Sequence, residues 1–189
     1  VNRALRELPA DVLLVRVQGV GSFVAESQGQ TALFQINNIA DEIASRNHQH
    51  RAEVLVLESI QADSLQSLQM QVQESHPLFH SIIVHFENDI PIQVEERLVN
   101  SFLVPDYLKQ DFTDITPHAY LMAHAPVTEG EHIIKAILVS TQEAKWLKIN
   151  KAEPCLLIRR RTWSNKNLIS SARLIYPGHR YHLEGKFTP

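Results

Sequence analysis

The chain contains a single cysteine, Cys155, so it cannot form an internal disulfide bond. Its first residues lack a positively charged and then apolar pattern ending in a small-residue cleavage site, so nothing in them supports secretion. The longest apolar runs, 78–84 and 133–139, are interrupted by a histidine or a lysine and are far shorter than the roughly 20 residues that cross a bilayer. We therefore expect a protein of the reducing cytoplasm that does not span a membrane.

Glycine is also scarce, with 6 copies among 189 residues, and proline stands at an average level with 9, which argues against collagen-like, low-complexity and disordered chains. Apolar residues make up 44% of the chain and charged residues 21%, as is usual for a globular protein. The length excludes three full domains. It fits one compact domain with a small appendage, or one large domain.

An overall excess of basic charge is missing too. The net charge is −3 and the pI is 6.4, whereas a DNA-binding domain commonly has a pI above about 9. The charge is nevertheless uneven, because residues 1–150 carry 10 basic and 19 acidic side chains and residues 151–189 carry 8 and 2. If the chain binds DNA, most of it must serve another purpose, and the basic C-terminal quarter is a candidate anion-binding side of a pocket.

Common sequence signatures of enzymes and metalloproteins are absent. The sequence has no Walker A motif, no Gly-x-Ser-x-Gly elbow and no Gly-x-Gly-x-x-Gly followed by a helix. His48 and His50 form the closest histidine pair, but no second pair stands at ligand spacing, and a solvated loop is the commoner explanation. We expect no metal, no cofactor and no catalytic residue, and we expect Cys155 to be a packing residue in an apolar strand.

What the sequence does contain is a series of short strands and helices. Asn38 and Thr116 are predicted helix N-caps, and Pro117 follows Thr116 at the first helical position. Hairpins outnumber strand–helix–strand units, which predicts an α+β fold with a mostly antiparallel sheet and flanking helices. The predicted helices are 1–8, one beginning at 39, 63–70, one beginning at 117 and 141–149, and the predicted strands are 13–17, 19–24, 53–60, 79–86, 91–99, 132–139, 155–164 and 168–176.

The predicted hairpin 79–86 and 91–99 has one apolar and one polar face. Successive side chains of a strand point to opposite faces. The polar face then carries Ser81, His85, Gln93, Glu95 and Arg97, and the apolar face carries Ile82, Val84, Phe86, Ile92 and Val94. Polar strand faces usually meet solvent, but a face of this kind can also line a cavity, and both interpretations stay open.

The same alternation separates three consecutive arginines. It places Arg160 on the side of Leu156 and Ile158, and Arg159 and Arg161 on the other side. An arginine that shares a face with apolar side chains needs an anionic partner, since buried charges are normally paired. That partner is either Glu95, which would make Arg160 structural, or the carboxylate of a ligand.

Two N-terminal segments resemble a known DNA-binding module. Residues 1–8 have the pattern of an amphipathic helix, and a Leu-Leu strand at 13–17 leads into QGVGSFV at 18–24. This order and spacing resemble the recognition helix and wing of the GntR superfamily of winged-helix repressors. The resemblance implies that residues 1–25 are the remnant of a winged-helix domain that binds operator DNA, and that 26–31 form a linker. The implied DNA-binding residues are Asn2, Arg3, Arg6, Gly19 and Gly21.

The rest of the chain, residues 32–189, resembles the UTRA ligand-sensing domain, which has a chorismate lyase-like fold. The segments that carry the resemblance are HFENDIPIQVEER at 85–97, DFT at 111–113, TP at 116–117, EPCLL at 153–157, RRTWS at 160–164 and YPGHRY at 176–181. Within the superfamily the chain is most similar to repressors of histidine-degradation genes. This implies a non-enzymatic homodimer that urocanate, the first product of histidine breakdown, releases from DNA.

The resemblance also implies where the effector binds. In relatives that sense sugar phosphates, an Arg-x-Arg on the first hairpin strand and a glutamate on the second hold the ligand, and these positions are Ile83, His85 and Glu95 here. The loss of both arginines disfavours a phosphate and suits a small planar ligand with one carboxylate and an imidazole. The implied effector-binding residues are His85, Glu95, Asn38, Thr116, Arg160, Ser170 and Tyr176.

The expected roles differ among these residues. His85 and Glu95 would form hydrogen bonds with the imidazole, whereas Asn38 and Thr116 would receive the carboxylate at helix N-termini. Tyr176 would stack on the ligand or donate its hydroxyl. Two alternatives to this function stay open: a GntR-type repressor that senses a sugar phosphate or another small acid, and a chorismate lyase-like enzyme, which would need no recognition helix and wing at 1–25.

Overall fold

The computed structural model describes residues 13–17, 21–25, 38–125 and 127–183, and the chain divides into two units, 1–35 with 183–189 and 36–182. In the first unit, β1 (Leu13–Val17) pairs antiparallel with β2 (Gly21–Ala25), which confirms the predicted hairpin. The predicted helix 1–8 and linker 26–31 lie outside the described residues. So do Asn2, Arg3, Arg6 and Gly19, whereas Gly21 begins β2.

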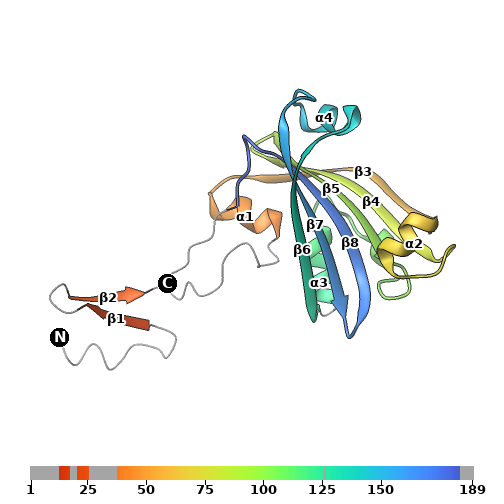
Figure 1. Ribbon diagram of the computed structural model, residues 1–189, viewed down its shortest axis with the longest axis horizontal. Helices are drawn as coiled ribbons and strands as arrows, with labels where there is room; N and C mark the ends of the chain where they lie inside the picture. The colour runs from red at the N-terminus through yellow and green to blue at the C-terminus, as the bar shows by residue number, and fades with distance from the viewer. Residues whose placement is uncertain (1–12, 18–20, 26–37, 126, 184–189) are drawn as a thin grey trace. The chain divides into compact units, whose positions relative to one another are not determined.

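The second unit is built around one six-stranded sheet whose neighbouring strands are all antiparallel (Figure 1). The order across the sheet is β3-β4-β5-β8-β7-β6. The strands are β3 (His50–Gln61), β4 (Pro77–Glu87), β5 (Ile90–Asn100), β6 (Glu129–Leu138), β7 (Pro154–Ser164) and β8 (Asn167–Pro177). The antiparallel α+β fold predicted from the sequence is confirmed.

Two tight turns set the register of the central strands. Asn88 and Asp89 join β4 to β5 with φ angles of 47° and 65°, and Asn165 and Lys166 join β7 to β8 with φ angles of 47° and 71°. Two consecutive residues with positive φ make a turn whose twist matches that of antiparallel strands. Asparagine adopts this conformation more readily than most residues, so the local sequence specifies both hairpins.

The helices that flank the sheet are short. They are α1 (Ile39–Ser45), α2 (Ser64–Met70), α3 (Pro117–His124) and α4 (Thr141–Leu147). The described residues also contain a 3-10 turn, η3 (Tyr107–Lys109), that the sequence did not predict. Lys148 takes a left-handed conformation with φ of 51°, which ends α4 two residues earlier than predicted. Among the described helices, none is long and apolar enough to cross a membrane.

Side-chain caps explain where these helices begin. Asn38 Oδ1 accepts from the Ala40 amide and Thr116 Oγ1 from the Ala119 amide, so both predicted N-caps are confirmed. The helices α2 and α4 begin with reciprocal capping boxes, in which Asp63 and Ser140 are the N-cap residues. Each cap satisfies amide groups that a short helix would otherwise leave without a partner.

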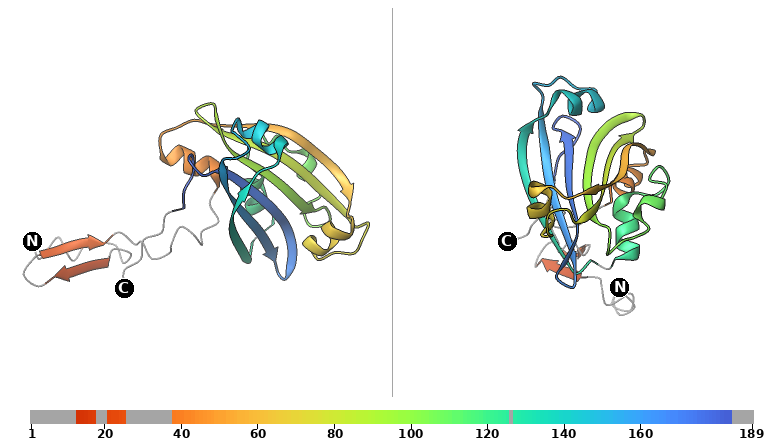
Figure 2. Two further views of the ribbon diagram at one scale, coloured as in Figure 1. Left: turned by 45° about the horizontal axis from the view of Figure 1, so that its top comes forward. Right: turned by 90° about the vertical axis from the view of Figure 1, so that its right-hand side faces the viewer.

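The helices pack on both faces of the curved sheet (Figure 2). On the face that we call inner, Phe112 and Tyr120 pack in one core with Ile83 and Val99. On the outer face, Leu147 of α4 packs with sheet residues in a second core, which contains Val84, Val94, Cys155, Leu157 and Ile175. Cys155 is buried there, as expected of a packing residue.

Candidate functional site

The polar face of the β4–β5 hairpin is the inner face, and it is buried. The exposed fractions of His85, Gln93, Glu95 and Arg97 are 0%, 2%, 3% and 1%. Of the two interpretations that the sequence left open, a solvent-facing strand is therefore wrong. Burying this many polar and charged groups is costly unless they are paired with one another or with a ligand.

Strand register brings these groups together with polar residues of β7 and β8. His85 lies opposite Gln93 across β4 and β5. Ala172 of β8 is the register partner of Arg97 on one side and of Arg160 on the other. The register therefore places the two arginines on either side of Ala172 on the same face. Burial lowers the pKa of Arg160, and the positive charge of Arg97 lowers it further.

Glu95 and Arg97 form the ion pair at the centre of this face. Arg97 Nε donates to Glu95 Oε1 at 2.7 Å, and Arg97 Nη1 donates to Ser170 Oγ at 3.0 Å. Thr162 Oγ1 lies 2.9 Å from the same Ser170 hydroxyl. Burial by itself would raise the pKa of Glu95, but the Arg97 guanidinium outweighs it and holds that pKa below its usual range. Glu95 is thus a buried carboxylate that stays ionised.

His85 lies beside Glu95. We call His85, Gln93, Glu95 and Arg97 the inner-face cluster. His85 Nε2 lies 3.8 Å from Glu95 Oε2, and His85 Nδ1 lies 3.0 Å from Nε2 of His50 on β3. Burial lowers the pKa of His85 to about 4, although the Glu95 charge acts in the opposite direction. Burial also lowers the pKa of His50. Both imidazoles are therefore neutral near pH 7.

Tyr176 belongs to a second group of contacts on this face. Gln93 Nε2 donates to the Tyr176 hydroxyl, and the Tyr176 ring stacks on Tyr181 with centroids 3.9 Å apart. Tyr181 donates in turn to Glu42 Oε2 of α1 at 3.4 Å. These contacts connect the sheet to the first helix of the unit through aromatic side chains.

Asn38 and Thr116 meet, although 78 positions separate them. Thr116 Oγ1 donates to Asn38 Oδ1 at 2.8 Å, so the two predicted N-caps join the starts of α1 and α3. His118 lies in the first turn of α3, and its pKa is lowered to about 4 by burial and by the charges of Arg160 and Arg97. The same electrostatic environment includes Glu95. The start of α3 thus lies next to the charged cluster.

Arg160 is buried on the inner face, while Arg159 on the next position is exposed, as alternation predicts. Arg160 Nε donates to Nε2 of His132 at 2.9 Å. Glu95 forms its hydrogen-bonded ion pair with Arg97. The sequence predicted Arg97 on this face but did not include it among the effector-binding residues.

The structure brings all seven predicted effector-binding residues into this region, and it adds others. Sequence reasoning left Arg97, Gln93, His118, His50 and Tyr181 out of the site. Two signals could have found some of them: the period of two continues from Glu95 to Gln93 and Arg97, and His118 stands two residues after the predicted N-cap Thr116. His50 and Tyr181 come from β3 and from the segment after β8, and no local pattern relates them to the hairpin.

Other parts of the described chain show fewer features of a functional site. No group of three His, Cys, Asp or Glu side chains in them is arranged to hold a metal ion. A groove of about 240 Å³ crosses the outer face, where Arg161 is paired with Glu131, and Arg173 with Glu96 and Glu143. Its lining residues are Gln69, Glu131, Ile133, Arg159, Arg161, Ser171 and Arg173.

Comparison with known proteins gives one family. The model of the UTRA domain matches residues 45–182. The histidine utilization repressor of Pseudomonas putida is 57% identical over 188 residues, which cover 100% of this chain and 76% of that protein.

Solved structures agree with this match. The C-terminal domain of the histidine utilization repressor from Pseudomonas syringae pv. tomato is 55% identical, with a TM-score of 0.73, and the similarity covers 75% of this chain and 100% of that one. PhnF from Mycobacterium smegmatis has a TM-score of 0.75 over 99% of this chain and 83% of its own, but it is only 16% identical, so it shows the fold alone.

Proposed function

Because this chain belongs to the UTRA domain family and, within it, to the histidine utilization repressors, we propose that it represses histidine utilization genes in response to a small effector. It would act in the cytoplasm as a DNA-binding transcriptional regulator and not as an enzyme. Its relatives at this level of identity are named as repressors, which disfavours a chorismate lyase-like activity.

The proposed effector is urocanate, a planar acid with one imidazole and one carboxylate. The observation that carries this proposal is the buried inner-face cluster around Glu95, where the Glu95 carboxylate is already neutralised by Arg97 and the neighbouring His85 is neutral. Such a site offers polar contacts without a large excess of positive charge. It therefore suits an imidazole better than a phosphate dianion.

The roles proposed for individual residues follow their places. His85 and Glu95 contact the imidazole, and Tyr176 covers it or donates its hydroxyl. Asn38 and Thr116 bring the amides of two helix starts to the carboxylate, since their own side chains are engaged in capping and with each other. Ser170 positions Arg97. Arg160, close to Arg97 in the register, supplies positive charge for the effector carboxylate.

Calorimetric titration of the chain with urocanate tests this choice, with histidine and glucosamine 6-phosphate as comparison ligands. We expect heat of binding from urocanate and at least about tenfold weaker binding of the other two, which corresponds to about 1.4 kcal/mol. Binding of glucosamine 6-phosphate without binding of urocanate would replace our effector by a sugar phosphate.

The DNA-binding part of the proposal concerns residues 1–25, as a winged-helix remnant, and the linker 26–31. Asn2, Arg3 and Arg6 would contact operator DNA from the recognition helix, and Gly19 and Gly21 would let the wing backbone approach the duplex. Residues 32–189 would sense the effector. Urocanate can release the operator only if it binds the DNA-incompetent arrangement more tightly than the competent one.

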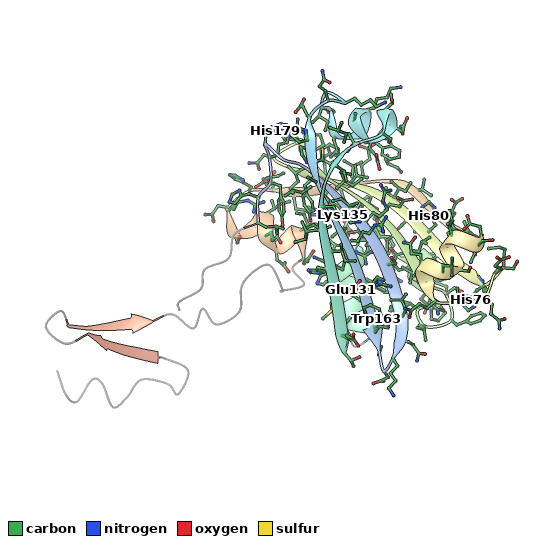
Figure 3. All side chains as sticks on the ribbon, in the orientation of Figure 1. His76, His80, Glu131, Lys135, Trp163 and His179 are labelled. Carbon is green, nitrogen blue, oxygen red and sulfur yellow. The ribbon has the colours of Figure 1, made fainter. Side chains whose placement is uncertain are left out.

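The proposal includes a homodimer, for which β6 offers a surface. This strand ends the sheet order and exposes Ile133 and Ile134, at 39% and 40%. Glu131 and Lys135 stand on the same strand, two positions to either side of Ile133 (Figure 3). Antiparallel pairing of two copies about Ile133 would therefore place Glu131 opposite the partner subunit's Lys135, and the reverse.

A further inference from the structure

Three atoms in the inner-face cluster are buried without a hydrogen-bond partner among the described residues. They are His85 Nε2, Gln93 Oε1 and Arg97 Nη2. Leaving such a group unpaired costs about 1–3 kcal/mol, and more when it is charged, so three together on one face need an explanation. A bound ligand can supply the missing partners.

The chemical character of two of the atoms is fixed by their covalent groups. Arg97 Nη2 can only donate, because a guanidinium has no acceptor. Gln93 donates through Nε2 to Tyr176, so its buried Oε1 is left as an acceptor. A ligand must therefore accept from Arg97 and donate to Gln93.

The character of His85 Nε2 follows from its neighbours. A neutral imidazole carries its proton on one nitrogen only. The negative charge of Glu95 Oε2, 3.8 Å from His85 Nε2, favours the proton on this nitrogen over a lone pair that would face the carboxylate. His85 Nδ1 then accepts from His50 Nε2 at 3.0 Å. His85 Nε2 is thus a second donor, opposite Gln93 in the register.

We propose that Gln93 and His85 form hydrogen bonds with the two nitrogens of a neutral imidazole in the ligand, and that Arg97 binds the carboxylate of the ligand. The ring N–H donates to Gln93 Oε1, and the other ring nitrogen accepts from His85 Nε2. This inference rests on the proposed function, adds Gln93 and Arg97 to its site, and gives the ring contact of Glu95 to Gln93, because both ring nitrogens are then bound. Glu95 acts instead by keeping the proton on His85 Nε2. The arrangement also gives the preferred ionic form, since an imidazolium would bring two N–H donors to a single unpaired acceptor.

The same arrangement explains discrimination against histidine. Histidine has the imidazole and the carboxylate of the proposed ligand, but it adds an ammonium group with three donors. Among the described buried side chains, the only acceptor without a partner is Gln93 Oε1, and the ring N–H already uses it. The ammonium would be desolvated without a matching acceptor, which disfavours its binding.

The test combines ligand and protein changes in one cycle. Calorimetry compares urocanate with 3-(3-pyridyl)acrylate, which keeps a ring acceptor and the carboxylate but lacks the ring N–H. Each ligand is titrated into the wild type, into Gln93→Met and into Gln93→Leu as a second variant. We expect Gln93→Met to weaken urocanate binding by about tenfold relative to its effect on the pyridyl ligand, the value of one hydrogen bond.

Ser81→Ala serves as the matched control, because Ser81 is buried on the same face but bonds to Tyr107. It should leave the ratio of the two affinities unchanged. If the Gln93 variants lose the same affinity for both ligands, while the wild type binds urocanate, the proposed hydrogen bond between Gln93 and the ring N–H is overturned. Absence of urocanate binding to the folded wild type would instead overturn the proposed function.

Discussion

Arg97 Nε donates to Oε1 of Glu95 at 2.7 Å, and Arg97 stands two positions after Glu95 on the same strand. Both side chains are almost fully buried. Residues at this spacing share a strand face, so the local chain places the two charges side by side. Covering helices then remove them from water. Each charge therefore needs the other as its buried counter-ion, and the pair is also the centre of the proposed site.

Loss of the Glu95 charge should therefore destabilise the second unit strongly. In Glu95→Gln, Arg97 keeps its charge without a counter-ion, and breaking a buried pair in this way costs about 3–5 kcal/mol. Urea unfolding followed by circular dichroism measures the effect. The double variant Glu95→Gln/Arg97→Met should recover much of it, because neither buried charge remains. A double variant no more stable than the single one would contradict a direct coupling.

Stability should fall on acidification because of His85. Burial lowers the pKa of its imidazole from 6.5 to about 4, so between these values the unfolded chain takes up a proton that the folded chain does not. This group costs about 2 kcal/mol of stability at about pH 5 and nothing well above pH 6.5. Urea unfolding near neutrality and at about pH 5 should give a loss about 2 kcal/mol smaller in His85→Gln than in the wild type. An equal loss in both proteins would mean that His85 is protonated when folded.

The two N-cap hydroxyls of Thr116 and Ser140 provide a matched pair of changes. Each accepts from an amide in the first turn of its helix, and removal of either should cost about 1 kcal/mol in thermal unfolding. Only Thr116 also bonds to Asn38 near the charged cluster. Thr116→Ala should weaken urocanate binding several-fold, Ser140→Ala should not, and Thr116→Ser should restore it. Similar affinities in all three variants would place Thr116 outside the site.

The proposed dimer surface on β6 can be tested by measuring the oligomeric state of variants. Ile133→Asp puts a charge at the centre of the proposed strand pairing and should convert the dimer to a monomer in size-exclusion chromatography with light scattering. Leu65→Asp is the control, since Leu65 is an apolar residue of α2 with an exposed fraction of 78%. A dimer that persists in Ile133→Asp would move the interface elsewhere.

Local chemistry made much of the fold predictable. Asn88 and Asn165 tolerate the positive φ of tight turns, and Asn38 and Thr116 cap their helices through their own side chains. These interactions reach only a few residues along the chain. The short turn η3 escaped prediction because Tyr107 is held by packing with Phe112 and Tyr120, not by a local sequence signal.

By itself, the sequence determined the order of strands and helices and which side chains share a strand face, because both depend on nearest neighbours and on the period of two. It also carried the family resemblance that pointed to His85 and Glu95. Only the tertiary structure decided that their face is buried, that Arg97 is the directed partner of Glu95, and that His50 and His118 stand beside the cluster. Those contacts depend on how β3 pairs with β4 and how α3 packs against the sheet, and contacts between distant segments leave no periodic trace in the sequence.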